Sequence, residues 1–309
     1  MQFERPNNIA TNEQYRGRFA PSPSGLLHFG SLIAALASFL DAKSSINSVG
    51  QPGKWLVRIE DIDPPREKVG ASQKILKTLE AFGLHWDEDV TFQSQQSELY
   101  LDLLSQLKKR HLLYACQCTR AIIKGQGGLY NGLCKDLNLD SKNNAIRLIN
   151  QYGIYQFDDI FQGNVSCNKR LSEEDFIIHR KDGLFAYQLA VVADDIAQNI
   201  NHVIRGCDLL EPTARQLTLF KVFSKKPPQY GHIPLAVTSS GFKLSKQNAA
   251  SPIDNSLPQP ALFQALKFLG LQPDKALVDE PVEVIIDWAV KHWLRDKIPK
   301  KSEILISSC

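Results

Sequence analysis

Along residues 16–110, segments typical of strands alternate with segments typical of helices, and this alternation constrains the fold more than any other feature. The strand-like segments are residues 16–20 and 54–59, and the helix-like segments are residues 29–42, 67–82 and 94–110. Between the first strand and the first helix stands PSPSG, whose two prolines and glycine exclude both a helix and a strand ladder. Because strands that alternate with helices pack as mostly parallel sheets, we expect an α/β fold.

In the rest of the chain the sequence pattern changes twice, from regular to irregular segments and back to segments typical of strands and helices. Short irregular segments with several cysteines follow residue 115, and we interpret them as an insertion. Further strands are predicted at residues 185–192, 202–204 and 233–237, and further helices at about 211–223, 260–269 and 282–294. We therefore expect four parts: a first half of the α/β domain at residues 1–115, of which 1–14 form a loose arm, the insertion at 116–184, a second half at 185–250, and a short helical cap at 251–309.

The composition is that of a globular protein. Of the 309 residues, 43% are hydrophobic and 22% charged, which excludes disordered and low-complexity classes. The longest apolar stretch, residues 32–40, is too short to cross a membrane, and the N-terminal residues lack the apolar segment of a signal peptide. We expect a cytoplasmic monomer that does not bind membranes. The net charge of +3 neither requires nor excludes a nucleic acid partner.

Two short motifs suit nucleotide chemistry. The first, PSPSGLLHFG at residues 21–30, brings His28 and Gly30 to a helix N-terminus, where a histidine could donate to a triphosphate oxygen and a glycine lets a flat base approach. The second, KLSKQ at residues 243–247, places two lysines in a loop after a strand, within reach of the phosphates of ATP. Taken singly, the first motif could equally be an ordinary proline turn, and the second is better explained as a solvated surface loop.

Together the motifs resemble the HIGH and KMSKS signatures of the class I aminoacyl-tRNA synthetases. The sequence from Arg16 to about Asn248 is similar to that of the glutamyl branch of that family. The similar segments are GRFAPSPSG (17–25), VRIEDIDPPRE (57–67), DFIIHRKDG (175–183), AYQLAVVADD (186–195) and VIRGCDLLEPT (203–213). Glutaminyl enzymes usually have a PEPNG-type turn in place of PSPSG, which argues against glutamine as substrate.

This resemblance implies a Rossmann-like catalytic domain that binds ATP with Mg²⁺. It implies a catalytic group made of His28, Gly30, Lys243 and Lys246, and ATP contacts from Pro21, Ser31, Ser245 and Lys246. Two positions depart from the family signatures. Ser31 stands where HIGH has its second histidine, and Gln247 ends the KMSKS-like motif.

A glutamate site is implied by the same resemblance. Glutamate has two carboxylates, which match the fork of an arginine, and one ammonium, which suits a carboxylate. The residues placed around it are Arg18, Phe19, Ala20, Pro21, Ser22, Glu60, Tyr187 and Arg205, with Glu60 on the ammonium and Arg18, Arg205 and Tyr187 on the carboxylates. Which arginine holds the side-chain carboxylate is open. The alternatives are an ion pair of Arg58 and Glu60 at a strand end, and Tyr187 as a half-buried aromatic residue of a sheet.

The insertion contains a candidate metal site. Cys116 and Cys118 are one residue apart and Cys134 follows beyond a loop, and three such thiolates can share a tetrahedral zinc ion. The resemblance offers Tyr130 as the fourth ligand of one structural Zn²⁺. The competing fourth ligands are Cys167, His111, His179 or water, and the alternative to a metal site is three reduced cysteines in the core.

Within the branch, the chain most closely resembles the short paralogues of glutamyl-tRNA synthetase. The resemblance implies that L-glutamate is activated to glutamyl-adenylate without tRNA and transferred to the queuosine base at the wobble position of tRNA(Asp). Residues 248–309 are too short for an anticodon-binding domain, which supports that choice. The alternatives are a truncated glutamyl-tRNA synthetase that charges the 3′ end of tRNA(Glu), a smaller nucleotidylyltransferase, and a non-catalytic tRNA-binding protein.

Overall fold

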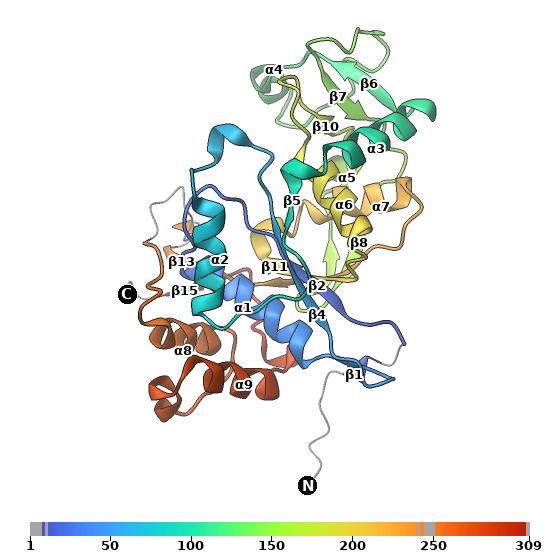
Figure 1. The fold of residues 1–309 in the computed structure, drawn as a ribbon. Helices are drawn as coiled ribbons and strands as arrows, with labels where there is room; N and C mark the ends of the chain where they lie inside the picture. The colour runs from blue at the N-terminus through green and yellow to red at the C-terminus, as the bar shows by residue number, and fades with distance from the viewer. Residues whose placement is uncertain (1–7, 10–11, 240–241, 244–250, 307–309) are drawn as a thin grey trace.

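The centre of the computed structural model, which describes residues 8–9, 12–239, 242–243 and 251–306, is a seven-stranded sheet (Figure 1). In order across the sheet, the strands are β5 (Thr91–Phe92), β4 (Lys54–Ile59), β2 (Arg16–Phe19), β11 (His202–Gly206), β12 (Gln229–Ile233), β8 (Gln156–Asp159) and β9 (Gly163–Ser166). Neighbouring strands are parallel, except that β8 and β9 form an antiparallel hairpin at one edge. The α/β, Rossmann-like expectation is confirmed.

Helix α1 (Phe29–Ser44) lies against the middle of this sheet and contacts β2, β4 and β11. Its repeating apolar positions, such as Leu32 and Leu36, are buried against the strands, which is why this stretch forms a helix with one covered face. The helix begins after His28, whose Nδ1 accepts a hydrogen bond from the backbone N–H of Ser31 at 3.3 Å. The preceding proline turn therefore fixes the N-terminus of α1 beside the end of β2.

The other helices lie around the sheet. They are α2 (Ala71–Ala81), α3 (Ser97–Lys109), α4 (Arg120–Gly125), α5 (Lys169–Glu173), α6 (Tyr187–Ala197), α7 (Thr213–Val222), α8 (Pro258–Phe268) and α9 (Val282–His292), with short 3-10 helices at Pro64–Arg66, Gln93–Gln95, Cys207–Leu209, Lys275–Asp279 and Arg295–Lys297. Helix α6 packs against α3 and α7, whereas α8 and α9 pack against α1. None of the helices in the described ranges is long and apolar enough to span a bilayer.

A small antiparallel sheet stands at the end of the molecule opposite α8 and α9 (Figure 1). Its strands, in the order β10–β7–β6, are β10 (Ile177–His179), β7 (Ala145–Leu148) and β6 (Leu113–Cys116). Most of the predicted insertion builds this end of the molecule. However, β8 and β9 also lie between residues 116 and 184 and belong to the large sheet, so the predicted range does not end at a structural border.

Two of the predicted strands need correction. Residues 185–192 were expected to form a strand, but they enter helix α6, because a mostly apolar run, interrupted here by Gln188, suits a helix buried between two other helices as well as it suits a strand. The strand predicted at 233–237 is split at Pro234, which has no backbone N–H to give to a ladder. Beyond this proline, β13 (Leu235–Ser239) joins a separate sheet, in the order β14 (Phe242–Lys243), β13, β15 (Glu303–Leu305).

Strand β13 thus has one neighbour that follows it directly in the chain and one from the distant C-terminal part. It pairs antiparallel with β14 and parallel with β15, where Leu235 lies opposite Glu303. The backbone N–H of Leu235 also donates to the carbonyl of Ser302 at 2.9 Å. The segment that follows the C-terminal helices therefore supports the strand that leads into residues 240–250.

The predicted loose arm at residues 1–14 is wrong for its described residues. Strand β1 (Asn8–Ile9) pairs parallel with β3 (Ile46–Asn47), and the Gln14 side chain donates to the Pro52 carbonyl at 2.8 Å. These contacts attach the arm to the edge of the α/β domain.

A buried carboxylate joins the C-terminal helical part to α1. Asp41 is fully buried and accepts hydrogen bonds from the Tyr15 hydroxyl at 2.7 Å and the Trp293 indole at 3.0 Å. Arg295 donates to both of its oxygens, each at 2.8 Å. Because every partner is a donor, the pKa of Asp41 is lowered although burial alone would raise it.

Candidate active site

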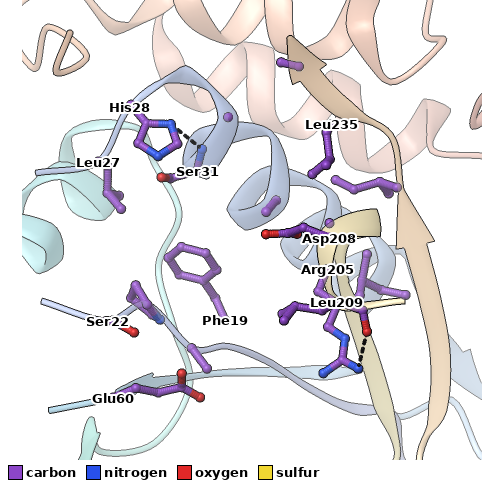
Figure 2. Close-up of a pocket in the computed structure, with 18 of the residues that line it drawn as sticks. Phe19, Ser22, Leu27, His28, Ser31, Glu60, Arg205, Asp208, Leu209 and Leu235 are labelled. Carbon is purple, nitrogen blue, oxygen red and sulfur yellow. Dashed lines mark hydrogen bonds between the residues drawn. The ribbon is translucent and has the colours of Figure 1, made fainter. Parts of the chain in front are cut away.

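A cavity of about 450 Å³ opens at the carboxyl ends of β2, β4, β11 and β12, beside the N-terminus of α1 (Figure 2). Open α/β sheets bind their ligands at this edge. The residues predicted around glutamate all line it: Arg18, Phe19, Ala20, Pro21, Ser22, Glu60, Tyr187 and Arg205. His28, Gly30 and Ser31 of the first motif line it as well. Residues far apart in the sequence are thus brought to one cavity.

The second motif is only partly described. Lys243 lies in β14, but its side chain, together with Ser245 and Lys246, lies outside the described residues. Described residues before and after residues 244–250 connect this part of the chain to the cavity. Ala236 of β13 lines it, and Pro252 forms an isolated β-bridge with His28.

Arg18 is held in the cavity wall by a carboxylate of α6. It is 4% exposed, and its Nε and Nη2 donate to the two oxygens of Asp195 at 3.1 and 3.2 Å. Arg58 donates to the same carboxylate at 2.8 Å and to the Gln198 side chain at 2.6 Å. The alternative ion pair of Arg58 with Glu60 is present only as a contact of 4.0 Å, so Arg58 serves mainly to hold Asp195.

Glu60 follows β4 and lines the cavity, and its contact with an arginine, to Nη2 of Arg58, is as long as 4.0 Å. Burial raises its pKa from 4.5 to about 7, Arg58 and Arg18 act in the opposite direction, and Asp195 and Asp194 add to the rise. A carboxyl group in such surroundings gains most from a cation that enters the cavity. The arrangement suits an ammonium group.

Arg205 lies in β11 and is 5% exposed. Its Nε donates to His232 Nε2 at 3.0 Å, and its Nη2 donates to the Thr213 hydroxyl at 2.7 Å and to the Leu209 carbonyl at 3.2 Å. Its Nη1 is buried and has no protein partner. A buried guanidinium N–H without an acceptor is costly unless a ligand supplies one, and a carboxylate is the acceptor that matches it best.

Tyr187 opens helix α6 and reaches the cavity from there. The alternative interpretation of Tyr187 as a sheet aromatic is therefore wrong, for the same reason that the strand at 185–192 is wrong. His28 is the N-cap of α1 and Gly30 stands in its first turn, where the helix dipole favours a phosphate.

Several residues of the site were not singled out from the sequence. Asp195 orients Arg18, His232 orients Arg205, and Asp208 lines the cavity (Figure 2). The available signal was their place next to strand and helix ends within segments that resemble the family, such as the two aspartates that close AYQLAVVADD. Hydrophobic periodicity carries no such signal, because it does not say which polar residues pair.

The cysteine cluster lies outside the cavity, in the small sheet and the loops beside it. The Sγ atoms of Cys116, Cys118 and Cys134 all lie within 4.8 Å of one another, and those of Cys118 and Cys134 are 3.5 Å apart. Sulfur atoms that share a tetrahedral zinc ion at Zn–S distances of about 2.3 Å are about 3.8 Å apart, so these three thiols fit that ion. Burial and the neighbouring thiols raise the pKa of Cys118 to about 12, a cost that a bound cation would remove.

Tyr130 is placed beside these thiols. Its hydroxyl oxygen accepts a hydrogen bond from the backbone N–H of Cys134 at 2.7 Å, and its ring lies 3.7 Å from the guanidinium of Arg147. Among the described residues, the cluster includes no fourth side chain of the His, Cys, Asp or Glu type. This leaves Tyr130 or water as the fourth ligand, and it does not favour Cys167, His111 or His179.

Comparison with known proteins agrees with this geometry. Residues 14–278 match the family described as tRNA synthetases class I (E and Q), catalytic domain. The chain therefore belongs to the class I tRNA synthetases of the glutamyl and glutaminyl type, as an α/β catalytic domain of that family.

Its curated relatives identify the group within that family. The chain is 63% identical to the glutamyl-Q tRNA(Asp) synthetase of Colwellia psychrerythraea strain 34H, over 99% of each chain. It is 50% identical to the protein of the same name from Escherichia coli K12, over 94% of this chain and 93% of that one.

Solved structures show the same fold at lower identity. A glutamate tRNA ligase from Elizabethkingia meningosepticum superposes with a TM-score of 0.77 at 24% identity, over 96% of this chain and 67% of the other.

Proposed function

We propose that this protein activates L-glutamate with ATP and transfers the glutamyl group to the queuosine base of tRNA(Asp). The observation that carries the proposal is the single cavity in which Glu60, Arg18 and Arg205 stand beside the N-terminus of α1. The names of the relatives at 50–63% identity support the choice of substrates.

The amino acid is held by charge complementarity. Glu60 receives the ammonium, and its ionisation is favoured by that cation. Arg205, which has a buried Nη1 without a partner, takes the side-chain carboxylate. Arg18 lies on the same wall, with its charge balanced by Asp195, and takes part in orienting the substrate. The α-carboxylate is then left to face the N-terminus of α1.

Adenylation is an in-line displacement at phosphorus. An oxygen of the α-carboxylate forms a bond to the α-phosphorus of ATP, the bond from that phosphorus to the bridging oxygen breaks, and pyrophosphate leaves with the electron pair. The N–H groups of the first turn of α1 and His28 stabilise the charge on the phosphates, with Lys243 and Lys246 on the leaving group. Mg²⁺ that arrives with ATP supplies further neutralisation.

Transfer follows when a hydroxyl of the queuosine cyclopentene ring attacks the activated carbonyl carbon. The bond from this carbon to the phosphate oxygen breaks, AMP leaves with the electron pair, and the hydroxyl proton passes to a phosphate oxygen of AMP. Bases of an anticodon loop can be splayed out of the stack and read by a protein, which allows this base to enter the cavity. A protein with these substrates works in the cytoplasm, and we propose that it acts there as a monomer.

We further propose that Cys116, Cys118, Cys134 and Tyr130 hold one zinc ion with a structural role. Three converging thiols support this assignment. The site lies outside the cavity, so the ion would shape the small sheet rather than take part in adenylation. Metal analysis of the purified protein tests the assignment directly.

The test of the proposed function is glutamate transfer to defined tRNA pools. Radiolabelled glutamate and ATP are incubated with tRNA(Asp) or tRNA(Glu), each with and without queuosine. We expect label only on tRNA(Asp) that contains queuosine, and we expect it to stay with the anticodon stem-loop when nuclease cleavage separates that loop from the 3′ end. Label on tRNA(Glu) that stays with the 3′ end would show instead a truncated glutamyl-tRNA synthetase.

A further inference from the structure

Three buried polar side chains form a row across the carboxyl edge of the sheet and end at the cavity. Asp159 closes β8, His232 lies in β12 and Arg205 lies in β11. Arg205 and His232 are paired directly in the parallel register, and β8 is the next strand beyond β12. Only Arg205 of the three lines the cavity, so the other two act on a ligand through it.

The first link of the row fixes the state of the imidazole. His232 is 0% exposed, and its Nδ1 is 2.5 Å from Asp159 Oδ2. The other oxygen, Oδ1, accepts backbone N–H groups from Phe161, Gln162 and His232 at 2.9–3.0 Å. A carboxylate surrounded by donors stays ionised and requires a proton on Nδ1. Burial lowers the pKa of His232, so the ring is neutral and Nε2 keeps a free lone pair.

The second link uses that lone pair. Nε2 of His232 is 3.0 Å from Nε of Arg205, and a guanidinium nitrogen is always a donor. The opposite tautomer would place two N–H groups against each other. Together with Thr213 and Leu209 on Nη2, this bond fixes the plane of the guanidinium and leaves Nη1 as its unpartnered donor.

The two arginines of the cavity therefore differ in charge balance. Arg18 touches the carboxylate of Asp195 with two of its nitrogens. Arg205 touches a neutral ring, and the carboxylate of Asp159 is held one imidazole away. Its positive charge is thus less compensated at close range and remains available to a substrate carboxylate.

We propose that Asp159 and His232 are positioning residues that hold Arg205 ready for the side-chain carboxylate of the amino acid and so set the preference for an acid over its amide. The proposal rests on the proposed function, since that function supplies glutamate as the substrate. An amide would turn an N–H₂ group or a weaker carbonyl acceptor toward Nη1, whereas a carboxylate offers two charged oxygens.

The decisive variant is Asp159→Asn, which changes one atom of the row. The amide oxygen can still accept the three backbone N–H groups, but its nitrogen is a donor. We expect the imidazole to move its proton from Nδ1 to Nε2 and to present an N–H to Arg205. Because a hydrogen bond to a charged group is lost, the Kd for glutamate should rise about 10- to 100-fold, with the KM for ATP unchanged. The preference for glutamate over glutamine should fall by a similar factor.

Asp175→Asn is the matched control. Asp175 is also a buried carboxylate that accepts a backbone N–H on one oxygen, from Asn150 at 2.7 Å, and a side-chain hydroxyl on the other, from Tyr114 at 2.9 Å. It does not line the cavity. This control should keep the wild-type affinity for glutamate and the wild-type discrimination against glutamine, even where its thermal stability falls.

Two measurements make the outcome unambiguous. Calorimetry gives the affinities for glutamate and glutamine, and ¹⁵N NMR of histidine-labelled protein, assigned with a His232→Gln variant, reports the tautomer in the free protein. A wild-type imidazole protonated on Nε2 overturns the proposal, as does an Asp159→Asn protein that binds glutamate like Asp175→Asn. If Asp159→Asn does not fold, the wild-type tautomer and a Thr213→Val variant, expected to weaken glutamate binding, still decide it.

If the proposed function itself is wrong, the experiments give a different result. In that case the wild-type protein shows no glutamate-dependent exchange between ATP and pyrophosphate, or labels another acceptor. The tautomer of His232 is measured without substrate, so it tests the Asp159–His232–Arg205 row independently of that result.

Discussion

We predict that Glu60 makes substrate binding sensitive to pH in the range where the enzyme would be assayed. Its pKa is raised to about 7, mainly by burial. The ammonium of glutamate is attracted by the ionised form and not by the protonated one. A carboxyl group with this pKa is ionised in about one molecule in eleven at pH 6 and in about ten of eleven at pH 8, so the affinity should be about tenfold weaker at pH 6.

Calorimetric titration of glutamate without ATP measures this effect. Neither the carboxylates nor the ammonium of free glutamate changes ionisation appreciably between pH 6 and pH 8, so the slope belongs to the protein. Glu60→Gln should bind weakly at both values and lose the slope. An unchanged Kd for the wild-type protein across this range, or a Glu60→Gln protein with the full slope, would refute the assignment of the ammonium site to Glu60.

The same carboxyl group gives a prediction for stability, with a defined sign. Its pKa is higher in the folded protein than its ordinary value of 4.5, so the folded state binds the proton more tightly. Its contribution to stability is present at low pH and is lost as the pH rises through about 7. Glu60→Gln should therefore be more stable than the wild-type protein at pH 8, by roughly 1–3 kcal/mol, and equal to it below about pH 4.5. Urea unfolding at both pH values checks this.

Three other predictions concern the KLSKQ motif, the cysteine cluster and the buried carboxylate of Asp41. Lys246→Ala should lower the rate of glutamate-dependent ATP–pyrophosphate exchange by about 100- to 1,000-fold while calorimetry shows glutamate still bound; normal exchange would contradict its role. Cys134→Ser should lose the zinc measured by mass spectrometry and lower the thermal midpoint by roughly 5 °C, and equal metal content in both proteins would count against the site. Asp41→Ala should cost about 3–5 kcal/mol in urea unfolding, because Arg295 loses its buried partner; a cost below about 1 kcal/mol would contradict this account.

Local patterns in the sequence were sufficient for the elements of the sheet near the N-terminus. The strand at residues 54–59 has the predicted bounds, and the helix predicted from residue 29 begins at that residue. Both are marked by strong local signals, a β-branched and aromatic run in one case and a proline turn with a one-sided apolar repeat in the other. Such signals depend on neighbours in the chain and survive without tertiary information.

Residues 185–192 show the limit of predicting helices and strands from local sequence patterns. The run is mostly apolar because α6 is buried between α3 and α7, so the pattern of apolar residues does not distinguish a helix from a strand. Pro234 presents a related limit, since a proline within an apolar run could mark an edge or a break, and only the pairing of β13 with β15 decides.

The candidate site was predictable only as a set of residues gathered by family resemblance. Glu60 and Arg205 were predicted because they lie in segments that resemble the family, and both line the cavity. Their partners do not follow, because Asp195 and His232 meet the arginines across 177 and 27 residues of chain, respectively. Which arginine keeps a free donor depends on these long-range bonds, and no local pattern contains that information.

The pairing of β13 with β15 has a consequence for protein synthesis. Leu235 and Ala236, which line the cavity, lie on a strand whose second neighbour comes from Glu303–Leu305. A growing polypeptide can assemble the large sheet before the ribosome has translated those codons, but β13 then has one edge bare. Messages interrupted before Glu303 would yield chains with the sheet in place and β13 without its partner β15, so we expect loss of this short segment to weaken the wall of the cavity that Leu235 and Ala236 form.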